Sequence, residues 1–332
     1  MARSVAARIA VLGDGGWGTT LASHLQRQGH CVRLWGAFPA YLKVLDRRRE
    51  NVKFLPGIRI PRQVHISPEL SQAVEGAHLL ILAIPAQYLR AVIRRLRSIP
   101  LDGDILSVAK GLEQGTSKRM SEVVREELGR VPLAVLSGPN VAIQIARGQP
   151  ASSVIASRSR RLAAAVQRIV SSDRLRLYTS TDVIGVELGG ALKNPIAIAA
   201  GISDGLGFGA NAKAALVTRG IVEISRLGVA LGARRETFWG LSGLGDLVTT
   251  CMAGRNRWLG EQLGRGRSLR SVLASTPMVI EGVDTAQAAL TLARRRGVEL
   301  PITEQVCAIL KRRRTPRQAL QALMLRARKA ES

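Results

Sequence analysis

A glycine-rich turn near the beginning of this chain of 332 residues is its clearest chemical signal. Gly13-Asp14-Gly15-Gly16-Trp17-Gly18 follows an apolar run at residues 8–12 and opens a helical pattern at residues 15–28. In such a setting the first glycine allows a tight turn, the second lets the backbone approach a pyrophosphate, and the third lets the helix pack closely on the strand. The amides at the start of the helix then face the phosphates. The motif and its position together predict a dinucleotide-binding site.

The residues after the second expected strand, at 31–35, bear on the choice of dinucleotide. A carboxylate there usually holds the ribose 2′-hydroxyl of NAD, but this chain has Gly36 and Ala37 at that place. Arg33 and the arginine cluster at residues 47–49 could receive the 2′-phosphate of NADP instead. The sequence therefore leaves both NADP and NAD open.

A second candidate site is Arg255-Asn256-Arg257. This run suits a phosphate because guanidinium is a planar, two-pronged donor that stays charged. Arginine is abundant in the chain, so an unrelated surface residue is the alternative interpretation. Thr250 is a further candidate donor to a phosphate, whereas the neighbouring Cys251 is interpreted as a packing residue. The four histidines, His24, His30, His65 and His78, have no metal-binding spacing, so we expect no metal site.

Length and composition describe an ordinary globular protein. With 46% hydrophobic and 22% charged residues, the 332-residue chain suits two domains. Its best apolar run, around residues 79–83, is far shorter than the roughly 20 residues of a membrane span, so we expect no integral membrane segment. The N-terminus has no apolar stretch typical of a secretory signal. Three widely separated cysteines, Cys31, Cys251 and Cys307, favour a reducing cytoplasm.

The net charge of +25 is the unusual feature. It comes from short arginine clusters that are spread along the chain on expected helix faces or ends. We interpret most of this charge as a solvated basic surface, with steering of anionic ligands as the second interpretation. Aromatic residues are only 3% of the chain, so the stacking surfaces of single-strand binders are scarce and nucleic acid is not the favoured partner.

The chain changes character near residue 180. Before it, expected strands at 8–12, 31–35, 79–84, 105–109, 133–136, 153–156 and 175–179 alternate with helical segments such as 158–170. This order predicts an α/β fold, with an N-terminal, Rossmann-like, doubly wound and mainly parallel sheet. From residue 181 onward only helical patterns remain, broken by a glycine-dense segment at 201–209 that predicts a loop. We therefore expect a dinucleotide-binding domain at 1–180 and an all-helical substrate and catalytic domain at 181–332.

The chain resembles the NAD(P)-dependent glycerol-3-phosphate dehydrogenases of the bacterial type along nearly its whole length. The matching segments occur in the family's order and are 54–57 (FLPG), 110–113 (KGLE), 137–140 (SGPN), 187–194 (ELGGALKN), 203–211 (SDGLGFGAN), 243–247 (GLGDL), 255–257 (RNR) and 301–304 (PITE). One such match would be weak, but eight in order are specific. Ala37 and Gly254 depart from the bacterial pattern, which has a histidine or arginine and a serine at these places.

The resemblance implies reversible hydride transfer between NAD(P)H and dihydroxyacetone phosphate, giving sn-glycerol 3-phosphate for glycerophospholipid synthesis. It implies that Lys193 is the general acid/base, that Lys110 touches substrate and cofactor, and that Asp246 supports both lysines. The substrate-binding residues that it implies are Lys110, Gly138, Asn140, Lys193, Asn194, Asp246, Thr250, Gly254, Arg255 and Asn256. The cofactor-binding residues that it implies are Gly13, Gly15, Gly16, Trp17, Gly18, Ala37, Lys110, Ala142, Arg255, Val279 and Glu281. The family is often dimeric, so a homodimer is possible.

The composition supports the implied role of the two lysines. Only eight of the 49 basic residues are lysines, at 43, 53, 110, 118, 193, 213, 311 and 329. Lysine can lose a proton near neutral pH when it is buried, and arginine cannot. A second lysine lowers the pKa of the first and stabilises an oxyanion. The alternative to a catalytic role for Asp246 is a structural one, in which it is the N-cap of a helix that starts after Gly245.

Two other functions compete with this interpretation. One is a related two-domain dehydrogenase that acts on a hydroxy acid and so recognises a carboxylate in place of a phosphate. The other is a basic nucleic-acid-binding module, or a dehydrogenase that also binds nucleic acid, which would show a steep dependence of affinity on salt.

Overall fold

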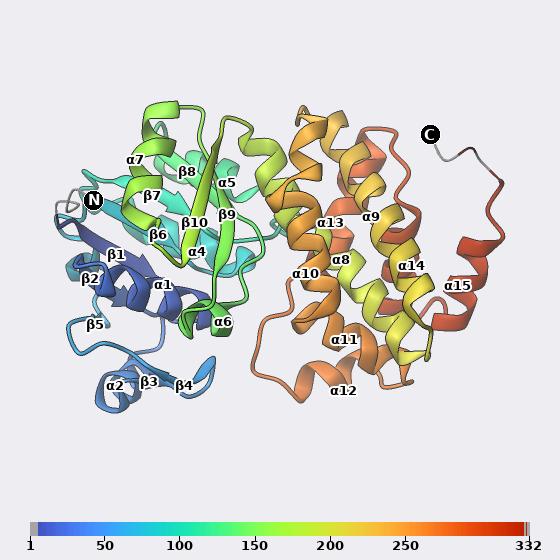
Figure 1. Cartoon of the computed structure of the whole chain (residues 1–332), viewed down its shortest axis with the longest axis horizontal. Helices are drawn as coiled ribbons and strands as arrows, with labels where there is room; N and C mark the ends of the chain where they lie inside the picture. The colour runs from blue at the N-terminus through green and yellow to red at the C-terminus, as the bar shows by residue number, and fades with distance from the viewer. Residues whose placement is uncertain (1–5, 329, 331–332) are drawn as a thin grey trace.

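The computed structural model describes residues 6–328 and residue 330. Its first half builds an eight-stranded sheet in the order β10-β9-β8-β7-β6-β1-β2-β5 (Figure 1). The strands are β1 (Arg8–Leu12), β2 (Cys31–Trp35), β5 (His65–Ser67), β6 (Leu79–Leu82), β7 (Asp104–Ser107), β8 (Leu133–Ser137), β9 (Ala151–Ala156) and β10 (Leu175–Ser180). All neighbours pair in parallel except β8 and β9, which are antiparallel. The predicted, mainly parallel sheet is confirmed.

Helices cover both faces of this sheet because successive strand residues point to opposite sides. Ile9 and Val11 of β1 pack in one core with helices α1 and α7, whereas Ala10 and Leu12 pack in another with α3, α4 and α5. The helices of this half are α1 (Gly16–Arg27), α2 (Pro39–Arg48), α3 (Leu70–Val74), α4 (Ala86–Leu96), α5 (Met120–Leu128), α6 (Ala142–Ala146) and α7 (Arg160–Val170). The sequence patterns did not predict β5 or the small antiparallel pair β3 (Glu50–Asn51) and β4 (Leu55–Arg59). Strands β3 and β5 are too short for a periodic signal, and β4 contains Pro56 and Gly57, which are rare inside strands.

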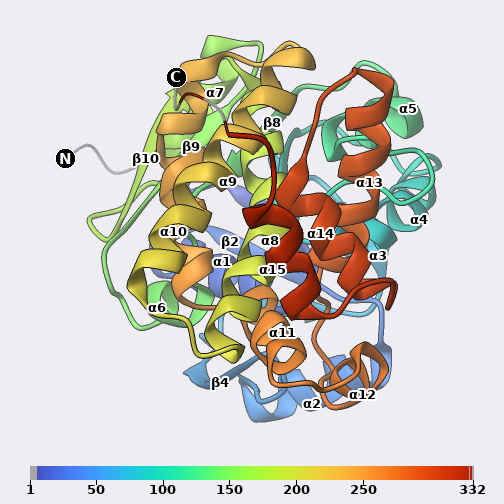
Figure 2. The same ribbon diagram turned by 90° about the vertical axis from the view of Figure 1, so that its right-hand side faces the viewer.

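The second half is helical, and the described residues after Ser180 form no strand, which confirms the predicted class of this domain. Figure 2 shows α8 (Val183–Gly205) at the centre of the other helices. These are α9 (Ala210–Ala230), α10 (Asp246–Met252), α11 (Arg255–Gly264), α12 (Leu269–Ala274), α13 (Gly282–Arg295), α14 (Pro301–Leu310) and α15 (Pro316–Met324), with a 3-10 turn η1 (Arg235–Trp239) and a π turn η2 (Leu241–Gly245).

Helix α8 corrects the expectation that the longest apolar run lies around residues 79–83. By length and composition alone, α8 could cross a membrane, and it is the one such helix among the described residues. However, 83% of its most apolar window is buried inside the protein. Lys193 and Asn194 interrupt the apolar pattern, which is why the sequence did not show it as one run. The burial identifies α8 as the core helix of this domain.

The predicted loop at 201–209 is wrong in its first half, because α8 continues to Gly205 and only residues 206–209 lie outside helices. Its glycines serve helix packing. A Cβ on Gly201 would lie 1.9 Å from the carbonyl oxygen of Arg257 in α11, and one on Gly260 of α11 would lie 2.0 Å from the carbonyl oxygen of Ile198 in α8. The two backbones therefore touch, and any larger side chain at these places would separate the helices.

Candidate active site

The candidate residues of the first domain gather at the carboxyl ends of the parallel strands. Gly13 follows β1, Gly36 follows β2, Lys110 comes after β7, and Gly138 follows β8. In an open α/β sheet this edge is where ligands bind. The topology thus places segments that are far apart in the sequence around one site.

The glycine turn has the geometry of a cradle for a pyrophosphate. Gly13 has φ +120°, and a Cβ there would lie 2.3 Å from the carbonyl oxygen of Ala83. A Cβ on Gly18 would lie 1.9 Å from the carbonyl oxygen of Gly13, so helix α1 starts directly against β1. Beside Gly15, in contrast, there is open space, and no side chain caps the N-terminus of α1. The free helix amides and the open space fit the phosphates of a dinucleotide.

Three other candidate cofactor residues lie around this turn. A Cβ on Gly16 would lie 2.6 Å from the carbonyl oxygen of Phe54, so the loop before β4 closes over the turn. The indole Nε1 of Trp17 is buried without a hydrogen-bond partner in the described part of the chain. Ala142 begins α6, and its carbonyl oxygen accepts a hydrogen bond from Thr20 Oγ1 (3.3 Å). These contacts join β4 and α6 to the start of α1.

The end of β2 differs from the expectation. Ala37 is exposed, and the carboxylate of Asp14 lies against Gly36, where a Cβ would come within 2.5–2.7 Å of its three atoms. Burial raises the pKa of Asp14, and its Oδ2 is buried without a hydrogen-bond partner among the described residues. Asp14 is not among the residues predicted for the site, although an acidic residue inside the glycine turn is a visible signal in the sequence. A carboxylate therefore does lie at the end of β2, although neither Gly36 nor Ala37 supplies it and it comes from the glycine turn.

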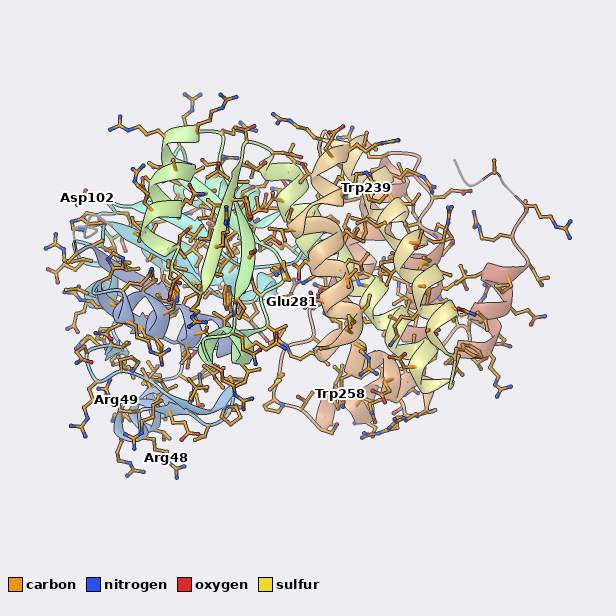
Figure 3. All side chains as sticks on the ribbon, viewed as in Figure 1. Arg48, Arg49, Asp102, Trp239, Trp258 and Glu281 are labelled. Carbon is orange, nitrogen blue, oxygen red and sulfur yellow. The ribbon has the colours of Figure 1, made fainter. Side chains whose placement is uncertain are left out.

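The arginines that were expected to receive a 2′-phosphate have other contacts. Arg33 donates to the carbonyl oxygens of Gln72 and Glu75 at the end of α3. Arg49 pairs with Asp46 and donates to a backbone carbonyl (2.7 Å). Figure 3 shows Arg48 and Arg49 at the outer end of the first domain, far from the labelled Glu281 between the domains. Arg33 and Arg49 are thus already engaged by other groups.

Lys110, Lys193 and Asp246 converge where the two domains meet. Lys110 Nζ donates to Asp246 Oδ2 (2.7 Å) and to the carbonyl oxygen of Gly138 (2.7 Å). Lys193 Nζ donates to Asp246 Oδ1. The N-cap of α10 is Gly245, which makes no side-chain cap, so the N-cap alternative for Asp246 is wrong. The carboxylate binds the two lysines instead.

Burial gives this cluster its chemistry. The side chains of Lys193 and Asp246 are only 7% and 2% exposed. Desolvation, opposed by the Asp246 carboxylate and reinforced by the Lys110 ammonium, lowers the pKa of Lys193 to about 7. An amine with this pKa can both give and accept a proton near neutral pH.

The backbone around Lys193 explains how the cluster forms. A Cβ on Gly189 would lie 2.4 Å from the carbonyl oxygen of Ser242, and one on Gly190 would lie 2.3 Å from Ser137 Oγ. Since these glycines precede Lys193 by one helical turn, the end of β8 and the turn η2 can approach α8 at that level. The turn η2 is a π turn, a conformation frequent at functional sites, and Asp246 follows it directly.

The candidate phosphate residues lie at the N-terminus of α11. Gly254 is its N-cap with φ +112°, makes no side-chain cap and has open space beside it. Arg255 donates from Nη1 to the carbonyl oxygen of Val279 (2.9 Å). Buried Asn256 donates to Asn194 Oδ1 (2.9 Å) and accepts from the amide of Gly282 (3.0 Å). The uncapped helix start beside a guanidinium can hold an anion.

Two further candidates differ in how much hydrogen-bonding capacity they have left. Asn140 accepts from Ser153 Oγ, while its Nδ2 is buried without a partner in the described chain. That amide can donate to a ligand. Thr250 Oγ1 donates to the carbonyl oxygen of Asp246 (2.7 Å), so its only proton is already in use.

Glu281 joins the two domains at the candidate site. Its Oε1 accepts from the amide of Ala86 at the start of α4 (3.0 Å), while Oε2 is buried and has no partner in the described chain. Burial raises the pKa of Glu281 to about 7, and Arg255 lowers it. Figure 3 places this side chain between the sheet domain and the helical domain.

Cys251 and the histidines take no part in this site. Burial raises the pKa of the Cys251 thiol to about 12, so it stays protonated and packs in the helical core. The rings of His24 and His30 lie within hydrogen-bond distance of backbone oxygens of α7 (2.9 and 3.2 Å). Among the residues that the structure describes, no group of three or more His, Cys, Asp or Glu could hold a metal ion.

Comparison with known proteins gives one consistent family. The family model "NAD-dependent glycerol-3-phosphate dehydrogenase N-terminus" matches residues 8–163, and the model of its C-terminus matches residues 182–321. The protein of Chlorobium phaeobacteroides (strain BS1) named glycerol-3-phosphate dehydrogenase (NAD(P)+) is 47% identical over 98% of this chain and 99% of its own length. The protein of the same name from Citrifermentans bemidjiense is 45% identical, with 98% and 99% covered. The solved structure of glycerol-3-phosphate dehydrogenase from Coxiella burnetii has a TM-score of 0.93 and 38% identity, with 97% of this chain and 99% of that chain covered.

Proposed function

The chain belongs to the family of NAD-dependent glycerol-3-phosphate dehydrogenases, and on this premise we propose roles for the residues that meet between its domains. The reaction is reversible hydride transfer between NAD(P)H and dihydroxyacetone phosphate, which gives sn-glycerol 3-phosphate. This product is the backbone precursor of glycerophospholipids. The observation that carries the assignment of roles is the buried contact of Lys193 and Lys110 with Asp246.

Lys193 is the proton donor and acceptor at the C2 oxygen of the substrate. When the nicotinamide dinucleotide is bound at the glycine turn, it supplies or accepts the hydride at C2. Lys193 protonates the oxygen as the ketone is reduced and takes the proton back in the reverse direction, which its lowered pKa permits. Lys110 stabilises the developing oxyanion and keeps the pKa of Lys193 low. Asp246 orients both amines and prevents their repulsion from opening the site.

The phosphate of the substrate binds at the N-terminus of α11. Its ligands are the free amides at Gly254, Arg255 and Asn256 together with the Arg255 guanidinium. Asn194 holds Asn256 in place through their buried hydrogen bond. Asn140 donates its free amide to the substrate, beside Gly138, whose carbonyl oxygen fixes Lys110. Thr250 acts through its contact with the Asp246 backbone.

The dinucleotide binds along the carboxyl edge of the sheet. Gly13, Gly15, Gly16 and Gly18 hold the pyrophosphate, with Trp17 and Ala142 behind the turn. Lys110, Arg255, Val279 and Glu281 surround the nicotinamide end, where Glu281 has an unpaired oxygen. Ala37 lies near the adenosine.

At the adenosine end, we propose a preference for NADH over NADPH. The Asp14 carboxylate beside Gly36 accepts the ribose 2′-hydroxyl and repels a 2′-phosphate. Lys53 is the cation that lowers the pKa of Asp14, but its ammonium lies over the rings of Tyr41 and Phe54 (5.8 and 5.2 Å to their centroids).

A kinetic comparison tests these roles. The purified protein should oxidise NADH or NADPH with dihydroxyacetone phosphate, and unphosphorylated dihydroxyacetone should be a much poorer substrate. Lys193→Ala should remove most of the activity while circular dichroism shows an intact fold. Lys118→Ala is the matched control, because Lys118 pairs with Glu126 on the surface of the first domain. An unchanged rate in Lys193→Ala would refute the mechanism, and equal use of a 2-keto acid would favour the hydroxy-acid dehydrogenase.

Three further assignments also belong to the proposal. The first is the domain division at residue 180, between the end of β10 and the start of α8. The second is a homodimer, supported by the exposed apolar side chains of Met324 and Leu325 (76% and 75%) on and after α15. The third is a cytoplasmic location, supported by three free cysteines. Sedimentation and cell fractionation test the last two.

A further inference from the structure

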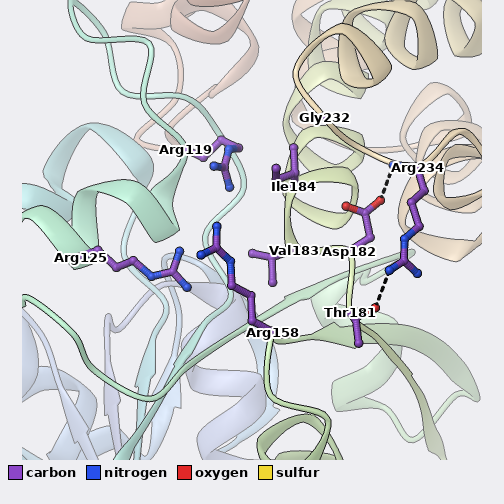
Figure 4. Close-up of a pocket in the computed structure, with 9 residues that line it drawn as sticks. All are labelled: Arg119, Arg125, Arg158, Thr181, Asp182, Val183, Ile184, Gly232 and Arg234. Atoms are coloured by element: carbon purple, nitrogen blue, oxygen red, sulfur yellow. Dashed lines mark hydrogen bonds between the residues drawn. The ribbon is translucent and has the colours of Figure 1, made fainter.

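A small pocket lined by arginines lies away from the candidate active site (Figure 4). Its volume is about 160 Å³. Arg125 lies in α5, and Arg119 is the residue before that helix. Arg158 lies in the loop between β9 and α7. The start of α8 and Arg234, which follows α9, complete its lining. The pocket therefore joins the sheet domain to the helical domain.

Two of these guanidiniums, those of Arg125 and Arg158, make no direct ion pair with a described carboxylate. Arg119 pairs with Glu187 and Glu122. Neither Arg125 nor Arg158 makes a hydrogen bond or an ion pair to any described residue, although Figure 4 shows them pointing toward each other. Burial and the charge of Arg158 lower the pKa of Arg125, while the nearby carboxylates of Glu187 and Glu122 oppose this shift. Arg125 is half-buried and Arg158 is exposed, so their like charges repel each other through partly screened space, and an anion between them relieves that repulsion.

The one carboxylate in the pocket lining is already engaged. Asp182 accepts hydrogen bonds from the amides of Gly185 (2.9 Å) and Arg234 (2.9 Å) and from Thr237 Oγ1 (2.7 Å). It thereby caps α8 and holds the loop after α9. Its oxygens are not directed to Arg125 or Arg158, so the lining itself does not neutralise them.

Elsewhere in the first domain, a half-buried arginine forms ion pairs with several carboxylates. Arg90 binds Glu113, Glu126 and Glu127. The abundance of arginine in this chain therefore does not by itself explain a facing pair without carboxylates.

We propose that this pocket is a second anion site, which binds a tetrahedral dianion such as inorganic phosphate or the phosphate group of a monoester. Arg125 and Arg158 hold the oxygens from two sides, while Arg119 stays paired with Glu187 and Glu122. Planar, permanently charged donors are the groups that suit this ligand. A dianion bound here contacts elements of both domains, so its binding stabilises the folded chain.

Calorimetric titration of the full chain at ~150 mM KCl tests the proposal, first with inorganic phosphate and then with glycerol 2-phosphate. We expect the double variant Arg125→Gln/Arg158→Gln to bind at one site fewer than the parent, or at least tenfold more weakly at that site. The control is Arg130→Gln/Arg161→Gln, which removes the same charge from exposed arginines of the same region outside the pocket. It should bind as the parent does.

The two ligands distinguish free phosphate from a monoester by their relative affinities, and binding of either that is lost only in Arg125→Gln/Arg158→Gln supports the site. Equal binding by both double variants would overturn the proposal, because loss of charge alone would then account for any change. Absence of a phosphate site outside the α11 N-terminus in the parent protein would also overturn it. Since binding is measured without turnover, neither result depends on the catalytic roles proposed above.

Discussion

Lys110 and Lys193 bind the two oxygens of one carboxylate, that of Asp246, from different domains. Lys110 follows a strand of the sheet, and Lys193 lies in the core helix of the second domain. The contact therefore forms only when the domains are assembled. It places two ammonium groups beside each other with a single negative charge between them, and this net positive charge is what a developing alkoxide requires.

The pH dependence of the two directions should be opposite. In the proposed mechanism, reduction of dihydroxyacetone phosphate needs protonated Lys193, and oxidation of sn-glycerol 3-phosphate needs its neutral form. Because the pKa of Lys193 is lowered to about 7, the rate of reduction should fall as the pH rises through that value, and the rate of oxidation should rise. Initial rates between pH 5.5 and 9.5 in both directions measure this. Two profiles that bend in the same direction would exclude Lys193 as the proton-transferring group.

Asp246→Asn should move the midpoint of these profiles to lower pH, because the carboxylate raises the pKa of Lys193. It should also reduce the free energy of unfolding by about 3 kcal/mol at pH 6, where Lys193 is charged and loses its partner. The loss should be smaller at pH 9, where Lys193 is neutral. Urea titrations at both pH values and the rate profiles test this.

Asp204→Asn is the matched control for that variant. Asp204 also binds two cations, Lys213 and Arg257, but it is not part of the proposed site. It should lower stability without moving the midpoint of the rate profile. If Asp204→Asn moves the midpoint as much as Asp246→Asn does, the effect comes from net charge and not from the contact with Lys193.

The first domain could be predicted well because its signals are local. Each predicted strand appears in the sequence as a short run of apolar residues. Parallel pairing then brings the carboxyl ends of these strands to one edge of the sheet. For this reason Gly13, Lys110 and Gly138 gather without any further information. The proposed roles of Lys193 and Asp246 came from resemblance to a family. The residues around Lys193 in the sequence of α8 do not distinguish a catalytic lysine from a buried lysine without a catalytic role.

Other features were out of reach because they depend on contacts between distant segments. Gly201 looks like a helix breaker in isolation, since glycine disfavours a helix by about 1 kcal/mol relative to alanine. In the structure its contact with the backbone of α11 is what requires glycine. Arg125 and Arg158 are two among many arginines in the sequence, and only the fold shows that they face each other without a carboxylate.

Asp14→Asn should weaken the preference for NADH. Removal of the negative charge beside Gly36 removes repulsion of a 2′-phosphate, while the amide oxygen still accepts the ribose hydroxyl. We expect the ratio of kcat/KM for NADH to that for NADPH to fall about tenfold, which corresponds to about 1.4 kcal/mol. Asp46→Asn, an exposed carboxylate of α2, is the control and should leave the ratio unchanged. A ratio that Asp14→Asn does not alter would show that another group selects the cofactor.

Gly260→Ser tests the close contact of α8 and α11. The new Cβ would lie 2.0 Å from the carbonyl oxygen of Ile198, so the two helices must move apart. Overpacking of this kind costs about 1–3 kcal/mol of folding free energy. Gly209→Ser is the matched control, because Gly209 is the exposed N-cap of α9 with open space beside it, and serine is a good N-cap. Thermal and urea unfolding should therefore show a clear loss for Gly260→Ser and almost none for Gly209→Ser. Since α8 also carries Lys193, Gly260→Ser should lower kcat as well. Equal stability of Gly260→Ser and Gly209→Ser would mean that α8 and α11 are less tightly packed than the structure shows.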